Sequence, residues 1–204
     1  GRLSSEVIPK IEKLDDNRIN LSYEIIESEI SKVSKIVFIG NKNFSSSKLK
    51  SIMKTKEKRF LRFLSSADRY DPDKIEYDKQ LISQFYNNNG FPNFTFTSSV
   101  AQLSQNTNDF ELIMYIDEGD KYNFGDIEVS TELKKINADL ALSVISANSG
   151  DIFDRSKISE SIELIKELAE GEGYSFIEIN PKFREMSDNK TINIEIFINE
   201  GPRV

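Results

Sequence analysis

The sequence has no cysteine and no histidine among its 204 residues. Disulfide bonds, thiolate nucleophiles, zinc sites built from these residues and Ser-His-Asp catalytic triads are therefore all excluded. Tryptophan is absent too, so 14 Phe and 7 Tyr residues make up the whole aromatic content. The absence of cysteine is compatible with an oxidising compartment, where a free thiol is a hazard, but it does not identify that compartment.

A long apolar run and an excess of positive charge are also missing. No run approaches the roughly 18–20 apolar residues that a membrane-spanning helix needs, so we expect no membrane span in this chain. Residues 1–11 lack the basic segment followed by an apolar block that is typical of a signal peptide. The net charge of −7 repels phosphate, which argues against nucleic acid as a partner and against electrostatic binding to anionic lipid.

An internal repeat organises what the sequence does contain. Residues 70–75, Tyr-Asp-Pro-Asp-Lys-Ile, correspond to residues 153–158, Phe-Asp-Arg-Ser-Lys-Ile. The same offset of 83 positions relates Gly90 to Gly173. Most of the paired positions between these points keep the class of the residue, so the two segments are copies of one unit.

Upstream of these segments the offset changes. Ile36 corresponds to Ile127, which is an offset of 91 rather than 83, so the first copy contains an eight-residue insertion within positions 55–69. Each copy ends in a run of alternating apolar residues that is followed by an acidic residue and a glycine.

A similar alternating run lies near the N-terminus, at Ile19, Leu21, Tyr23 and Ile25. Without helices of its own, a hairpin there is expected to expose these side chains. The predicted domains are the C-terminal hairpin of an incomplete repeat (1–33), two complete repeats (34–119 and 120–201) and the start of a further repeat (202–204).

Local signals predict the elements of one repeat. Residues 34–39 are rich in β-formers and end in a Gly-Asn turn, which indicates a short strand. Ser45 or Ser46 can cap a short helix, and Asp71 and Asp154 can cap a longer amphipathic helix in each copy. Two alternating strands follow. This order predicts an α+β fold of tandem β-α-α-β-β repeats, each with a three-stranded mixed sheet and two helices packed on one face.

Four segments together resemble a POTRA (polypeptide-transport-associated) domain: residues 36–41, 70–71, 84–91 and 116–119. The insertion at 59–68 is similar to an aromatic-rich loop in the third POTRA domain of the BamA-type outer-membrane β-barrel assembly factors, especially the alphaproteobacterial ones. On this resemblance the predicted domains are the end of the second POTRA domain, the whole third and fourth, and the approach to the fifth.

The resemblance implies a scaffold rather than an enzyme, with no cofactor and no metal. It implies a location in the periplasm, as part of an outer-membrane protein of a Gram-negative bacterium. The implied partners are unfolded outer-membrane proteins, accessory lipoproteins, and the remaining POTRA domains and membrane barrel of the same full-length chain.

The resemblance also places the strand after the second helix at a sheet edge, where another polypeptide could add as a further strand. In the first copy this strand carries no charge. Its candidate binding residues are Asn93, Phe94, Thr95, Phe96, Thr97, Ser98, Ser99 and Val100. In the second copy the corresponding strand is 175–179. Glu178, Pro181 and Lys182 in and beside it are residues that discourage edge pairing, so we expect the first edge to bind better. A neighbouring repeat could instead cover the uncharged strand.

The insertion offers a second candidate surface. Arg59, Phe60, Arg62 and Phe63 could contact a partner, or the rings could pack under their own helices, which we favour for at least one ring. Asp68, Asp71 and Asp73 could suggest a cation site. Helix capping accounts for Asp71, and the helix dipole favours Asp73, so we expect no metal there.

Three other functions stay open at this point. The chain could come from a POTRA protein of two-partner secretion or autotransporter assembly, although the insertion argues against this. A hydrolase could work with two carboxylates alone, and a deep polar cleft would reveal it. A homophilic module would show itself as a concentration-dependent dimer.

Overall fold

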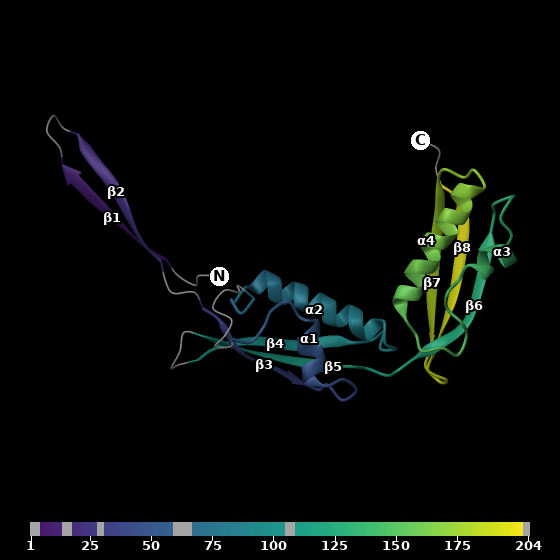
Figure 1. The fold of residues 1–204 in the computed structure, drawn as a ribbon, viewed down its shortest axis with the longest axis horizontal. Coiled ribbons are helices and arrows are strands. Elements are labelled where there is room, and N and C mark those ends of the chain that lie inside the picture. Colours follow the sequence, from purple (N-terminus) through teal and green to yellow (C-terminus); the bar gives the residue numbers. More distant parts are fainter. Residues whose placement is uncertain (1–4, 14–17, 28–30, 59–66, 105–108, 202–204) are drawn as a thin grey trace. The chain divides into compact units, whose positions relative to one another are not determined.

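The computed structural model describes residues 5–13, 18–27, 31–58, 67–104 and 109–201. Three sheets run through these residues, two of them with a pair of helices (Figure 1). The contacts divide the chain into two compact units, one of residues 1–82 with 96–116 and the other of residues 83–95 with 117–204. The N-terminal hairpin and the two repeats are described in turn below. Within the described residues, no helix is long and apolar enough to cross a membrane.

The N-terminal strands form an antiparallel hairpin of β1 (Ser5–Lys13) and β2 (Ile19–Glu27). Val7 lies opposite Ile25 and Ile11 opposite Leu21, so one face of the hairpin is apolar. The expected exposure of Ile19, Leu21, Tyr23 and Ile25 is present, at 47–64% of each residue's surface.

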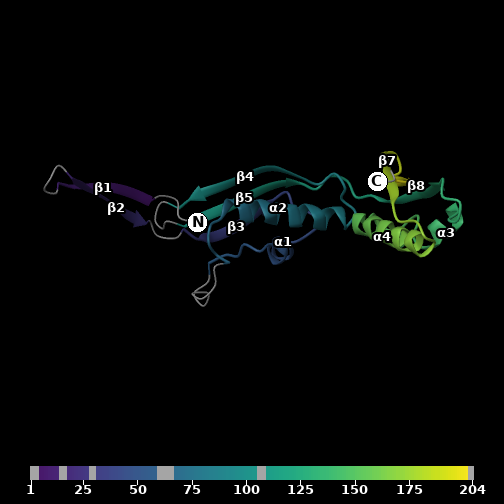
Figure 2. The same ribbon diagram turned by 90° about the horizontal axis from the view of Figure 1, so that it is seen from above.

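The first repeat contains one three-stranded sheet and two helices. Its elements are β3 (Val33–Ile39), α1 (Ser46–Ile52), α2 (Pro72–Asn87), β4 (Thr95–Leu103) and β5 (Phe110–Asp117). The strand order is β3-β5-β4, with β3 parallel to β5. Both helices lie on the same face of this sheet (Figure 2). Side chains that alternate along β3 and β5, among them Ile36, Leu112 and Met114, are buried beneath the helices.

The second repeat has the same architecture. Its elements are β6 (Asn123–Thr131), α3 (Ala138–Ser143), α4 (Arg155–Gly171), β7 (Ile177–Met186) and β8 (Thr191–Glu200). The strand order is β6-β8-β7, with β6 parallel and β7 antiparallel to β8. Phe124, Phe153, Ile165 and Ile194 lie in its core. The predicted α+β class, with a three-stranded mixed sheet and two helices in each repeat, is confirmed.

The predicted caps begin the helices. The Ser45 side chain accepts a hydrogen bond from the Lys48 amide, and the Asp71 carboxylate accepts from the Asp73 and Lys74 amides. The Asp154 carboxylate accepts from the Ser156 amide. These bonds satisfy amide groups that have no partner inside the helix, so the start of each helix is set by local sequence.

Candidate functional site: the edges of the two sheets

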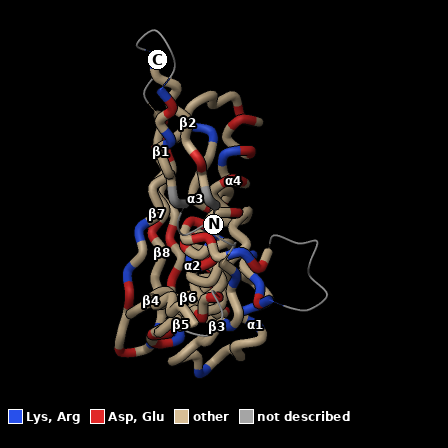
Figure 3. Tube along the Cα trace, turned by 90° about the vertical axis from the view of Figure 1, so that its left-hand side faces the viewer, with Lys and Arg blue, Asp and Glu red and all other residues tan. Residues whose placement is uncertain are grey.

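Strand β4 lies at an edge of the first sheet, because β5 separates it from β3. It begins at Thr95, two residues later than the predicted binding segment, and continues three residues beyond Val100 to Leu103. No residue of β4 is charged, and all except Phe96 are exposed. Figure 3 colours the charged residues of the chain. Among the described residues, no backbone hydrogen bond reaches 97–103 from outside the sheet. Within the described residues, this edge is therefore open.

The two residues before β4 anchor it instead of extending its edge. The Phe94 ring stacks on the Tyr86 ring of α2, with centroids 4.0 Å apart. The Asn93 side-chain amide donates to Glu185 Oε2 over 3.0 Å. A turn, in which the Phe94 amide donates to the Phe91 carbonyl, delays the start of the strand. Asn93 and Phe94 thus belong to the support of the edge.

Tyr86 itself is fully buried and donates a hydrogen bond of 2.8 Å to Glu118 Oε1. Burial raises the pKa of the Tyr86 phenol, and the hydrogen bond and negative charge of Glu118 raise it further. Glu118 is also buried, and it belongs to the Asp-Glu-Gly motif that ends the first repeat. This carboxylate therefore holds the ring against which Phe94 packs.

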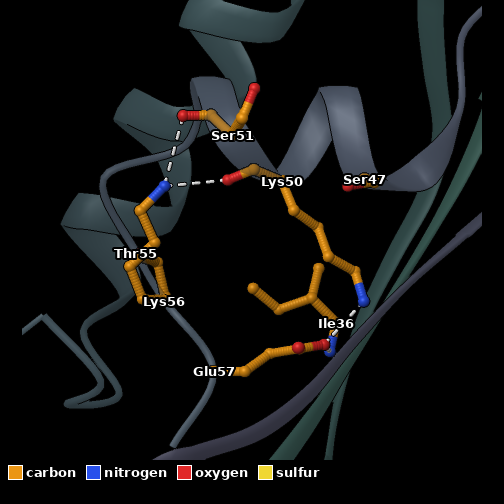
Figure 4. Close-up of a pocket in the computed structure, with 7 residues that line it drawn as sticks. All are labelled: Ile36, Ser47, Lys50, Ser51, Thr55, Lys56 and Glu57. Atoms are coloured by element: carbon orange, nitrogen blue, oxygen red, sulfur yellow. Dashed lines mark hydrogen bonds and ion pairs between the residues drawn. The ribbon is translucent and has the colours of Figure 1, made fainter. Parts of the chain in front are cut away.

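The opposite edge of the same sheet is closed by the chain itself. At the start of β3, the Val33 amide donates to the Asp68 carbonyl and the Val33 carbonyl accepts from the Lys58 amide, each over 2.7 Å. Further along, the Ile36 amide donates to Glu57 Oε1 over 2.9 Å (Figure 4). Glu57 occupies the position of a partner strand's carbonyl, so a polypeptide cannot pair with Val33 or Ile36 without displacing these contacts.

A cavity of about 250 Å³ lies beside this closed edge, between α1 and the 55–57 segment (Figure 4). Its single carboxylate is that of Glu57, which also accepts from the Lys50 amine over 2.7 Å. The Lys56 amine donates to the carbonyls of Lys50 and Ser51 at the end of α1. Two acidic groups facing one another, as a carboxylate hydrolase needs, are not found in this cavity.

A buried carboxylate on α2 holds the closing segment in place. Asp78 has no exposed surface and accepts hydrogen bonds from the Lys54 and Thr55 amides. The corresponding residue of the second copy is Ser161, whose hydroxyl accepts from the Ser146 amide over 3.1 Å. Neither residue of this pair was predicted from the sequence. The signal was a polar residue on an apolar helical face, since Asp78 lies three positions after Ile75 and four before Ile82.

The insertion is located by comparing the two copies. In the second copy the Phe124 amide donates to the Asp151 carbonyl and the Phe124 carbonyl accepts from the Gly150 amide. In the first copy, the Val33 amide donates to the Asp68 carbonyl and the Val33 carbonyl accepts from the Lys58 amide. The extra residues of the first copy therefore lie between positions 58 and 68. Arg59, Phe60, Arg62 and Phe63 lie outside the described residues.

Two ion pairs hold the ends of the insertion. Lys58 binds Asp109 over 2.8 Å, which raises the pKa of the Lys58 amine, and Lys32 binds the buried Asp68 over 3.0 Å. Asp68 is thus an ion-pair partner, and Asp71 is a helix cap. Within the part of the chain that the structure describes, no group of three or more acidic residues could hold a metal ion.

The edge strand of the second copy, β7, has a different character. It contains Glu178, Pro181 and Lys182, and Arg184 forms an ion pair of 3.1 Å with Glu195. The Gly201 amide donates to the Phe176 carbonyl. In the antiparallel register of β7 and β8, this bond shows which alternate residues of β7 point their backbone groups toward β8 and which point them outward. By this alternation Pro181 turns its nitrogen away from β8, so the open edge lacks one donor there.

Comparisons with known proteins identify relatives of the chain. The family model described as "POTRA: Surface antigen variable number repeat" matches residues 31–119 and 122–201. The outer membrane protein assembly factor BamA of Neisseria meningitidis serogroup B is 22% identical over 204 residues, which is 100% of this chain and 26% of that protein. BamA of Neorickettsia risticii is 24% identical over 181 residues, which is 89% of this chain and 24% of that protein. The chain thus spans about a quarter of the length of these curated relatives.

Solved structures show the same fold. The crystal structure of Haemophilus influenzae BamA POTRA3-5 has a TM-score of 0.69 and 23% identity, over 86% of this chain and 68% of that one. The structure of Haemophilus ducreyi BamA lacking POTRA domains 1-3 has a TM-score of 0.61 and 11% identity, over 83% of this chain and 29% of that one. The resemblance inferred from the sequence motifs is confirmed at the level of the fold and the family.

Proposed function

Since the chain belongs to the POTRA family and is homologous to the POTRA regions of BamA proteins, we propose that it is part of the periplasmic scaffold of an outer-membrane protein assembly factor. In this role it binds unfolded β-barrel clients and accessory lipoproteins by β-strand addition. It acts without a cofactor and performs no chemical step. The two complete repeats correspond to the third and fourth POTRA domains of such a factor, and the N-terminal hairpin to the end of the second.

The open, uncharged edge of β4 is the observation that carries this proposal. An added strand gains main-chain hydrogen bonds with little demand on its sequence, which suits a scaffold that meets many different unfolded clients. The first sheet leaves β4 open while it closes the start of β3 with Glu57, Lys58 and Asp68. A chain that only avoided aggregation would be expected to protect both edges.

The first copy is the better binding edge in this proposal. On β7, Pro181 removes an outward donor, and Glu178 and Lys182 add charges that a client strand would have to accommodate. Nothing in the sequence of β4 opposes a client in this way. The insertion at 59–68 is a second candidate contact for a partner in this proposal.

A pair of adjacent proline substitutions tests the binding edge. Neighbouring residues of a strand point their amide groups to opposite edges, so of Ser98→Pro and Ser99→Pro one removes an outward donor and the other a bond to β5. We expect the outward variant to weaken binding of a fluorescent unfolded barrel-protein peptide at least fivefold while the melting temperature stays nearly unchanged. The inward variant should lower the melting temperature.

The ranking of the two copies is tested in the same anisotropy titration. Thr95→Pro in the first copy should weaken peptide binding more than Ile177→Pro in the second. Equal losses would contradict the ranking. Hydrogen exchange with and without peptide gives an independent measure, and protection should concentrate in β4, residues 95–103. Protection confined to β7 or absent from both strands would contradict the proposal.

A further inference from the structure

The face of the first sheet that points away from the helices carries an apolar patch. On β3 and β5, Val37 lies opposite Ile113 and Ile39 opposite Tyr115. Their neighbours Ile36, Phe38, Leu112 and Met114 are buried on the helix side, so these four side chains face the other way. Ile39 and Tyr115 are 44% and 39% exposed. We call Val37, Ile39, Ile113 and Tyr115 the outer patch.

The second copy of the repeat shows that the fold does not require this patch. The corresponding positions are Glu128, Ser130, Glu195 and Phe197, with Glu128 opposite Glu195 and Ser130 opposite Phe197 in the same register. The buried positions between them stay apolar in both copies. The two sheets share one architecture but differ at these sites. The outer face is apolar in the first sheet and mainly polar in the second. An apolar surface that the fold does not need is typical of a contact surface.

The surroundings of the outer patch indicate the size of what it contacts. Lys35 lies opposite Glu111 at one end, and Asp117 follows Tyr115 and Ile116 at the other. The apolar surface between these charges consists of four partly covered side chains. Their exposed area is well below the roughly 800 Å² per partner that a stable protein complex needs. A self-associating dimer is therefore not favoured, whereas a short apolar segment of a longer chain fits.

We propose that the outer patch binds apolar side chains of an unfolded client polypeptide, as a second contact beside the β4 edge. This rests on the proposed function and assigns it a specificity. The strand β5 that carries half of the patch is the direct neighbour of β4, so the patch begins one strand, roughly 5 Å, from the open edge. A client held at β4 can therefore place a further segment on the patch. Alternating apolar residues, as in membrane-facing β-strands, match the pairs across β3 and β5.

Exchanging residues between the two copies tests this inference. The variant Val37→Glu/Ile39→Ser/Ile113→Glu gives the first copy the residues of the second at three of the four patch positions, and the fourth position is aromatic in both copies. The reciprocal variant Glu128→Val/Ser130→Ile/Glu195→Ile gives the second copy those of the first. The probe is a fluorescein-labelled, uncharged 16-residue peptide with alternating Val or Leu and Thr, titrated against the 204-residue chain. We expect the first exchange to weaken binding about tenfold and the reciprocal exchange to strengthen it several-fold.

The controls separate this inference from the proposed function. Unchanged binding in both exchanges, together with a loss in the outward-pointing proline variant of β4, would overturn the outer patch and leave the edge intact. No binding of the peptide to the unaltered chain would overturn both. Circular dichroism checks folding, and Ile39→Ser alone, which only introduces the serine found at position 130, replaces the triple variant if that does not fold. A concentration-dependent dimer that the first exchange abolishes, with peptide binding unchanged, would make the patch a self-interface and would also overturn the inference.

Discussion

Replacing Asp78 tests how the structure keeps one sheet edge closed. Its carboxylate has no exposed surface and accepts from two backbone amides, those of Lys54 and Thr55. In Asp78→Ala both amides lose their acceptor, and water has no direct access to Asp78. A hydrogen bond to a charged group contributes about 1.5–3 kcal/mol, so the loss of two should lower the free energy of unfolding by about 3–6 kcal/mol.

The second copy supplies the matched control. Asp78→Ser introduces the residue found at position 161, whose hydroxyl accepts from a single amide. We expect this variant to keep one of the two hydrogen bonds and to lose about half as much stability as Asp78→Ala. Urea unfolding followed by circular dichroism measures both values. Because the chain contains more than one repeat, the transition of the first repeat should move while that of the second stays in place.

The same substitution has a consequence for binding. Asp78 holds the segment that leads to Glu57 and Lys58, which cover Ile36 and Val33 at the edge of β3. In Asp78→Ala we therefore expect a second binding edge to open and the capacity for unfolded peptide to rise. A cost below about 1 kcal/mol in Asp78→Ala, or equal costs in Asp78→Ala and Asp78→Ser, would contradict this role of Asp78.

Three further predictions concern the residues beside β4. Tyr86→Phe should cost about 1–3 kcal/mol, because Glu118 loses a buried hydrogen bond. The pKa of Tyr86 is raised by folding, so its contribution is present below the unfolded pKa of about 10 and is lost as pH rises above it. Chemical unfolding between pH 9 and 11 should show the free energy of unfolding falling as pH rises in the unaltered chain, and falling less steeply in Tyr86→Phe. Hydrogen bonds from Tyr122 and Asn93 lower the pKa of Glu185, so its contribution is present above an unfolded pKa of about 4.3 and is lost as pH falls through the folded value. Glu185→Gln should flatten this acid dependence in thermal unfolding, and an unchanged profile would contradict the assignment. Gly90→Ala should cost at least about 1 kcal/mol in the same assay, because Gly90 has φ +95° and a Cβ there would meet a side-chain carbon of Ile152 at 3.0 Å.

Much of the fold could be predicted because its signals are local or periodic. The caps at Ser45, Asp71 and Asp154 act within three residues, and the burial of alternate residues in β5 and β8 follows from the two-residue period of a strand. Because the sequence contains two copies of the repeat, most of these signals occur twice and support the same assignment. The α+β class and the order of elements therefore needed no tertiary information.

The candidate site was predictable only in part. That the strand after the second helix forms an edge came from the resemblance to a family, and the structure places β4 at that edge. The predicted start of the binding strand was two residues too early, because Phe94 packs on Tyr86 and Asn93 binds Glu185 instead of continuing the strand. These contacts join residues 8 and 92 positions apart, and no local pattern marks them.

The sequence by itself determined which segments become helices and strands and that the chain is a tandem repeat, because these depend on neighbouring residues and on periodicity. Only the tertiary structure decided which edge is available to a partner. Glu57 covers Ile36 and Asp78 holds the covering segment, and both contacts join residues more than 20 positions apart in sequence. Such contacts depend on how the helices pack on the sheet, and the outer patch likewise became a surface only once β3 paired with β5.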